Sequence, residues 1–190
     1  MRGYRILGFL IASVLFLFIH HLHSQPLQGV TSPSEEFTLS FPFGKSHDYT
    51  DILVERVIDG DTVKLETGEK LRLIGIDTPE MHPSSKLDRD AERSSTDKST
   101  IQKLGLEAYK FTKKLVEGKR VSLEFDVQKY DKYDRMLAYV YLKEGGTFVN
   151  AEIVKQGYAS LLTIPPNVKY ADTFRKLYQE ARENKRGLWK

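Results

Sequence analysis

The sequence predicts an α+β fold that is mainly a five-stranded β-barrel and carries three helices. Three observations support this class. Apolar and polar residues alternate over five short stretches, which is typical of half-buried strands. Two further stretches, 101–115 and 170–181, repeat apolar residues at spacings of three and four, as amphipathic helices do. The part of the chain with these patterns has roughly 140 residues, which is enough for one hydrophobic core.

The first three strands are predicted to follow one another as a β-meander. Residues 52–57 lead into a turn at Asp59-Gly60, and residues 63–65 lead into a second turn at 67–69. The alternation continues over 71–75 as the third strand. Short turns of this kind join neighbouring antiparallel strands.

The segment 83–100 is polar and carries four basic and four acidic side chains. It is predicted to be a long solvated loop, and a loop of this length in a compact domain is either functional or disordered. The helix over 101–115 follows it and ends at Gly118.

The last part of the chain completes the pattern. Strands are predicted at 121–127 and at 136–142, and the second is apolar on both faces and therefore central. Asn150 is expected to cap a short helix that stops at Gly157, and the helix over 170–181 is the last. Five antiparallel strands with a helix between the third and fourth is the element order of an OB-fold barrel.

The N-terminal region is predicted to lie outside this domain. Arg2 and Arg5 precede an uncharged apolar run at 6–19, the pattern of a secretory signal. The run is short for a membrane span, which needs about 20 apolar residues. A cleaved signal over 1–24 is the favoured interpretation, and an uncleaved anchor over 4–23 is the alternative. Both would export the domain, either secreted or anchored with the domain outside.

Composition divides the chain further and limits its chemistry. Residues 25–48 contain three prolines and indicate a linker, although apolar alternation over 37–43 allows an edge strand. The domain is therefore assigned to 49–190. The first 50 residues carry three basic and three acidic side chains, so the net charge of +3 arises after them and suits a polyanionic partner. The chain has no cysteine, which excludes disulfides and thiolate chemistry.

Two short acidic motifs carry the strongest chemical signal. Asp61 and Asp77 each lie on a turn beside an apolar strand, and carboxylates so placed can converge on a hard cation such as Ca²⁺ or Mg²⁺. Glu80 follows three residues after Asp77, and two arginines, Arg72 and Arg135, are available as phosphate ligands. Metal, base and guanidinium groups together are what hydrolysis of a phosphodiester requires.

Each of these residues also has a structural interpretation. Asp61 alone would be a turn cap, and the charged segment 131–135 alone would be a solvated turn. Arg72 alone would pair across the turn with Glu66 or Glu69, a surface pair of small energetic effect. The occurrence of all the groups together favours a site.

Six motifs in order resemble the staphylococcal nuclease (thermonuclease) family from about residue 52 to Trp189. They are Asp59-Gly60-Asp61-Thr62-Val63 with Arg72-Leu73, Asp77-Thr78-Pro79-Glu80, Phe111-Thr112-Lys113-Lys114, Asp131-Lys132-Tyr133-Asp134-Arg135, Leu137-Ala138-Tyr139-Val140-Tyr141 and Val154-Lys155-Gln156-Gly157. The resemblance implies an OB-fold barrel, expected to be monomeric. It also implies calcium-dependent hydrolysis of DNA and RNA to 3′-phosphate products by an endonuclease of the micrococcal nuclease type.

The resemblance assigns roles by position. Asp61 and Asp77 would hold the Ca²⁺ with the backbone carbonyl of Thr78, and Glu80 would activate or orient the attacking water. Arg72 and Arg135 would bind the scissile phosphate, because a guanidinium matches two phosphate oxygens at once. Lys132 and Tyr133 match positions that contact a nucleotide phosphate.

Two departures from the family pattern bear on the substrate. Asp134 stands where the family usually has glycine; aspartate tolerates a left-handed backbone, but its charge could pair with Arg135 and weaken phosphate binding. The segment 160–167 lacks the tyrosines that stack on the base in the family prototype. Base stacking contributes roughly 1–3 kcal/mol per base, so affinity or base preference is expected to differ.

Two other functions remain compatible with the sequence. One is a catalytically inactive OB-fold module that binds nucleic acid or protein, although such a module would be expected to lose the acids and arginines that this chain retains. The other is a membrane-tethered interaction domain, which rests on the N-terminal segment alone.

Overall fold

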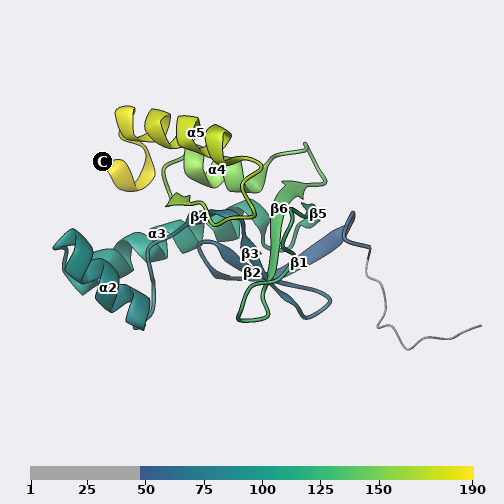
Figure 1. Cartoon of the computed structure of the whole chain (residues 1–190), viewed down its shortest axis with the longest axis horizontal. Helices are drawn as coiled ribbons and strands as arrows, with labels where there is room; N and C mark the ends of the chain where they lie inside the picture. Colours follow the sequence, from purple (N-terminus) through teal and green to yellow (C-terminus); the bar gives the residue numbers. More distant parts are fainter. Residues whose placement is uncertain (1–47) are drawn as a thin grey trace, which may run out of the picture. The chain divides into compact units, whose positions relative to one another are not determined.

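The computed structural model describes residues 48–190 (Figure 1). The predicted signal or anchor (1–24), nearly all of the predicted linker (25–48) and the edge strand allowed at 37–43 lie outside the described residues. Five strands form a closed barrel in the order β1 (Ile52–Asp59), β2 (Thr62–Leu65), β3 (Lys70–Leu73), β6 (Met136–Leu142) and β5 (Arg120–Glu124). The fold class predicted from the sequence is confirmed.

The barrel interior is filled by the alternating apolar residues of these strands. Val54, Leu65 and Leu71 are fully buried, and Leu73 is nearly so. On β3 the intervening residue, Arg72, points to the opposite face, as the period of two requires. The alternation therefore both builds the core and directs a charged side chain out of it.

One strand pair differs from the expectation of five antiparallel strands. β3 and β6 are parallel, with Arg72 opposite Leu137, while the other barrel pairs are antiparallel. The chain between β3 and β6 contains β4 (Gly75–Asp77), two helices and β5. A long crossover of this kind allows two strands to run the same way.

The predicted third strand also breaks where the sequence suggested that it continues. Gly75 has φ of 84°, a left-handed conformation, and a Cβ there would collide with the ring of Phe174. The chain turns at this point, and β4 (Gly75–Asp77) pairs antiparallel with β7 (Ser160–Leu162) in a separate two-stranded sheet. The break moves Asp77 off the barrel.

Two helices occupy the region from 85 to 116. α2 (Ser85–Ser94) replaces most of the loop predicted at 83–100, and α3 (Lys98–Val116) confirms the predicted helix and begins three residues before it. The hydroxyl of Ser84 accepts a hydrogen bond from the Leu87 N–H at 3.1 Å and so caps α2. Leu87 is the one fully buried residue of α2. The apolar periodicity was therefore too weak to indicate this helix.

The remaining helices are α4 (Val149–Lys155), α5 (Ala171–Glu183) and a 3₁₀ turn, η1 (Gly187–Trp189). α4 and α5 pack side by side (Figure 1). The described part of the chain thus has four α-helices, one more than predicted. Within residues 48–190, no helix has both the length and the apolar character needed to cross a membrane.

Asn150 does not cap α4, as the sequence suggested. The cap position is Phe148, and Asn150 is the second residue of the helix and is completely buried. Its side chain instead accepts a hydrogen bond from the Val140 N–H and donates one to the Ile74 carbonyl.

Candidate active site

A cavity of about 550 Å³ lies where the barrel strands β3 and β6, the loop between β5 and β6, the β4–β7 sheet and α2 meet. Its wall includes six of the eight residues predicted from the sequence to form the site. They are Asp61, Arg72, Asp77, Glu80, Tyr133 and Arg135. Thr78 lies beside the cavity, and Lys132 is not part of its wall.

Asp61 is the most buried acid of the site, with 3% of its surface exposed. One carboxylate oxygen accepts hydrogen bonds from the Thr78 N–H at 2.8 Å and the Thr78 hydroxyl at 3.1 Å. The other accepts one from the Thr62 hydroxyl at 3.0 Å. These bonds tie the turn that follows β1 to the segment that follows β4, so the two predicted acidic motifs are in direct contact.

Arg72 joins Asp61 to Asp77. It forms an ion pair with Asp61, and its Nη2 lies 2.8 Å from Asp77 Oδ1 and 3.1 Å from the Ile76 carbonyl oxygen. Burial lowers the pKa of Arg72 from its ordinary value, and the charge of Asp77 opposes that shift. The alternative pairing with Glu66 or Glu69 is not what the structure shows, because the partners of Arg72 are acids of the site.

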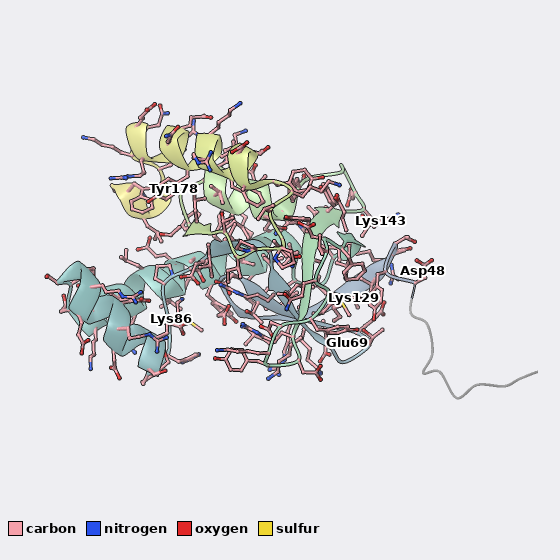
Figure 2. All side chains as sticks on the ribbon, viewed as in Figure 1. Asp48, Glu69, Lys86, Lys129, Lys143 and Tyr178 are labelled. Carbon is pink, nitrogen blue, oxygen red and sulfur yellow. The ribbon has the colours of Figure 1, made fainter. Side chains whose placement is uncertain are left out.

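Lys86 on α2, labelled in Figure 2, is a site residue that the sequence analysis did not single out. Its Nζ donates to the Thr78 carbonyl at 2.8 Å and lies 3.1 Å from both Asp77 Oδ1 and Glu80 Oε1. The ammonium group therefore contacts three oxygens that the resemblance places at or beside the metal.

The oxygens of this site have the chemistry that a hard divalent cation prefers. Asp61 and Asp77 supply two carboxylates, Thr78 supplies a backbone carbonyl, and all three residues belong to one hydrogen-bonded group. The Nζ of Lys86 already lies among three oxygens of this region. The residues therefore fit Ca²⁺ in donor type. In their present arrangement the acids are engaged with Arg72 and Lys86, and across residues 48–190 no three acid or histidine side chains form a ready metal site.

Helix α3 supports both acidic turns from behind. The Thr112 hydroxyl donates to the Gly60 carbonyl at 2.7 Å, next to Asp61. Seven residues earlier on the same helix, Gly105 packs so closely that a Cβ would come within 2.7 Å of the Glu80 and Pro79 backbone. Residues seven apart share one face of a helix, so one face of α3 fixes Asp61 and Glu80 relative to each other.

Arg135 is held at the cavity by Asp131. Its Nε and Nη2 lie 2.8 and 2.7 Å from one Asp131 oxygen, and the other oxygen accepts from the backbone N–H of Tyr133 and of Arg135. Burial raises the pKa of Asp131, but these bonds outweigh it and leave the pKa below its ordinary value.

Asp134 adopts the left-handed backbone that the sequence analysis anticipated, with φ of 59°. The suggested pair between Asp134 and Arg135 is wrong, however. Within the described part of the chain the ion pair of Arg135 is with Asp131. Asp131, four positions back in the turn, is the residue whose carboxylate reaches the guanidinium.

Tyr133 and Lys132 differ in their relation to the site. Tyr133 is 67% exposed and lines the cavity, and the Arg135 guanidinium lies 5.5 Å from the centre of its ring. Lys132 is exposed outside the cavity, 5.0 Å from the same ring. The structure therefore brings Tyr133 to the other site residues and leaves Lys132 at the margin.

Further residues of the wall were missed by sequence reasoning. Arg89 and Arg93 join Lys86 from one face of α2, and Leu162 and Ile164 contribute exposed apolar side chains to the wall. The spacing of the three basic residues, 86, 89 and 93, is helical. This spacing would have indicated a basic helix face if the segment had been predicted to be a helix.

Comparisons with known proteins show which family this chain resembles. The family model of staphylococcal nuclease homologues matches residues 70–190. The thermonuclease of Staphylococcus intermedius is 38% identical over 157 residues, covering 78% of this chain and 83% of that protein. An uncharacterized protein of Methanocaldococcus jannaschii is 33% identical over 202 aligned positions, covering 100% of this chain and 95% of that protein. The SPbeta prophage-derived endonuclease YokF of Bacillus subtilis is 35% identical over 147 residues, covering 75% of this chain and 45% of that protein. The chain therefore belongs to the staphylococcal nuclease family.

Proposed function

We propose that this protein is an exported, calcium-dependent nuclease that hydrolyses phosphodiester bonds of DNA and RNA to 3′-phosphate products. The observation that carries the proposal is the convergence of Asp61, Arg72, Asp77, Glu80 and Arg135 on one cavity. Relatives named thermonuclease and endonuclease support a nuclease.

The balance of charge in the cavity favours a metal-assisted reaction. Its wall holds five basic and six acidic side chains, so by itself it does not attract a polyanion strongly. Asp61, Asp77 and the Thr78 carbonyl would hold the Ca²⁺. When bound, the ion would offset the negative charge of the phosphodiester and so allow a nucleophile to approach.

The protein side chains supply the remaining functions. The carboxylate of Glu80 would accept a proton from, or orient, the attacking water. The guanidinium groups of Arg72 and Arg135 would bind the phosphate oxygens on which charge develops. Asp131 orients Arg135 through two short contacts, and Tyr133 borders the place where the nucleotide would lie.

An inactive binding module, the alternative from the sequence, is less well supported because the acids and both arginines are present and line one cavity. The export part of the proposal rests on residues 1–24, outside the described residues. N-terminal sequencing of the protein from medium and from membranes would distinguish a cleaved signal from an anchor over 4–23. We also propose that the protein acts as a monomer.

The nuclease activity is tested by incubating the purified protein with denatured DNA and with RNA. We expect cleavage of both in Ca²⁺, arrest by a chelator, and 3′-phosphate ends on the fragments. The assay is run at neutral and at alkaline pH. No calcium-dependent cleavage of either substrate at either pH would contradict the proposal.

A further inference from the structure

Lys86 places a fixed positive charge among the oxygens of the proposed metal site. Its Nζ contacts the Thr78 carbonyl, Asp77 Oδ1 and Glu80 Oε1 at 2.8, 3.1 and 3.1 Å. An ammonium group has three N–H donors and no acceptor, so three surrounding oxygens satisfy it completely. Two of these oxygens, from Asp77 and Thr78, belong to the set proposed for the metal.

The position of Lys86 follows from the structure of α2. The helix begins directly after its cap, Ser84, and Leu87 beside Lys86 is buried. α2 also packs against α3, which supports the acidic turns from the other side. The Lys86 side chain is only 26% exposed, so its charge is screened less than that of a surface lysine.

A divalent ion and this ammonium group cannot bind the same oxygens together. Two cations bound to one carboxylate oxygen repel each other strongly in a partly buried site. The Lys86 side chain must therefore leave Asp77 and Thr78 before a metal ion can take their oxygens. The same movement releases Glu80, which is then free to meet a water molecule.

We propose that Lys86 is an internal competitor of the divalent cation and that it sets the metal affinity of the site. This inference rests on the proposed function for the identity of the metal ligands, and it adds Lys86 as a residue that regulates metal binding. Binding of the ion and docking of Lys86 are then negatively coupled: each weakens the other by the same factor.

Calcium titration without nucleic acid tests the competition directly. The affinity of the full chain for Ca²⁺ is measured by calorimetry for the wild type, Lys86→Met and Arg89→Met. Arg89 is the matched control, because it lies on the same helix and lines the same cavity. Unlike the Lys86 ammonium group, its guanidinium is not among the groups bonded to Asp77, Thr78 and Glu80. We expect Lys86→Met to bind Ca²⁺ at least about fivefold more tightly, the lower end of typical coupling. The affinity of Arg89→Met should stay within about twofold of wild type, since solvent and salt screen an exposed charge.

A second measurement uses the unaltered protein and so does not depend on how the variant folds. Lysines are labelled by reductive methylation with and without Ca²⁺, and each site is quantified by mass spectrometry. We expect Lys86 to react slowly in the metal-free protein and faster when Ca²⁺ is present. Lys98, a 60% exposed lysine paired with Asp88, should react equally in both.

The outcomes separate this inference from the proposed function. Equal affinity of wild type and Lys86→Met, or unchanged labelling of Lys86, would overturn the competition while calcium-dependent cleavage could still stand. If wild type and Lys86→Met both fail to bind Ca²⁺, the metal site and its competitor are overturned together. Tighter binding by Lys86→Met with increased labelling in Ca²⁺ supports the inference.

Discussion

At the scale of single residues, Arg72 has two roles, one in holding the site together and one in the proposed reaction. It holds Asp61 and Asp77 together through ion pairs, and in the proposed reaction it also binds the phosphate. Burial lowers its pKa, yet a guanidinium stays charged near neutral pH. Replacing Arg72 would remove the ion-pair partner of the buried Asp61, so loss of activity would not separate catalysis from folding. Glu80 is a more informative residue to replace.

Glu80→Gln is expected to lose about 10²- to 10⁴-fold in turnover, the usual contribution of a general base. Its stability should change by less than about 1 kcal/mol, because the pair that it forms with Lys86 is partly solvated. The two measurements are cleavage of denatured DNA in Ca²⁺ and the thermal midpoint.

The matched control is Glu55→Gln, which breaks another glutamate–lysine pair, with Lys64 at 2.8 Å, away from the cavity. It should keep wild-type turnover. Wild-type turnover in Glu80→Gln would show that the role assigned to Glu80 is wrong.

Individual residues also show which parts of the candidate site could be predicted from the sequence. The placement of Asp61, Arg72, Asp77 and Glu80 around one cavity could be predicted, because each lies in or beside a short motif whose residue types suit one chemistry. The partner of Arg135 could not, since either Asp131 or Asp134 is close in sequence. Backbone geometry decided between them: Asp134 takes a left-handed conformation, while Asp131 accepts two backbone N–H bonds and faces the guanidinium.

At the scale of elements, α3 acts as the support of the site. Thr112 and Gly105 lie on one face of it and contact the Gly60 and Glu80 backbones respectively. The approach at Gly105 is possible only without a side chain, because Pro79 O and the Glu80 carbonyl carbon would lie 2.7 Å from a Cβ. The position of Glu80 therefore depends on a glycine inside the predicted helix 101–115.

Gly105→Ala should both destabilise the protein and slow the reaction. Alanine favours a helix by about 1 kcal/mol over glycine, but the collision with the Glu80 backbone is expected to exceed this, since overpacking costs typically 1–3 kcal/mol. Denaturant unfolding and cleavage rate are measured together. Lys103→Ala, at an exposed position of the same helix, is the control and should match wild type in both. An increase in stability for Gly105→Ala would contradict the packing argument.

α2 illustrates why an element can escape prediction. Its residues are mostly charged, and Leu87 is the only one that is fully buried, so the 3.6-residue period of apolar residues is nearly absent. The helix is instead favoured locally by its Ser84 cap and by packing against α3. Packing of this kind depends on residues that are distant in sequence.

At the scale of the whole molecule, two features depend on contacts between distant segments. β3 and β6 pair in parallel although more than 60 residues separate them, and β4 leaves the barrel to pair with β7. The alternation of apolar residues indicated the barrel strands well. It carries no information on the direction of a partner strand, so these pairings could not be predicted from it.

Asn150 connects these parts of the molecule. It lies on α4, accepts a hydrogen bond from the Val140 N–H of β6 at 3.0 Å, and donates one at 2.9 Å to the carbonyl of Ile74, where the chain leaves β3 for β4. The side chain is completely buried, so water cannot replace either bond. One amide group thus holds the helix, the barrel and the strand break that positions Asp77.

Asn150→Ala should therefore destabilise the whole domain. A buried backbone group that loses its partner costs about 1–3 kcal/mol. Here the Val140 N–H and the Ile74 carbonyl are both affected, so we expect a loss of roughly 2–6 kcal/mol in the free energy of unfolding. Asn184→Ala is the control, because Asn184 also donates to a backbone carbonyl, of Glu180 at 2.8 Å, but at an exposed helix end. Its stability should stay within about 0.5 kcal/mol of wild type, as for most surface changes. Denaturant unfolding measures both variants, and equal losses in the two would show that the buried Asn150 bonds do not hold the fold together.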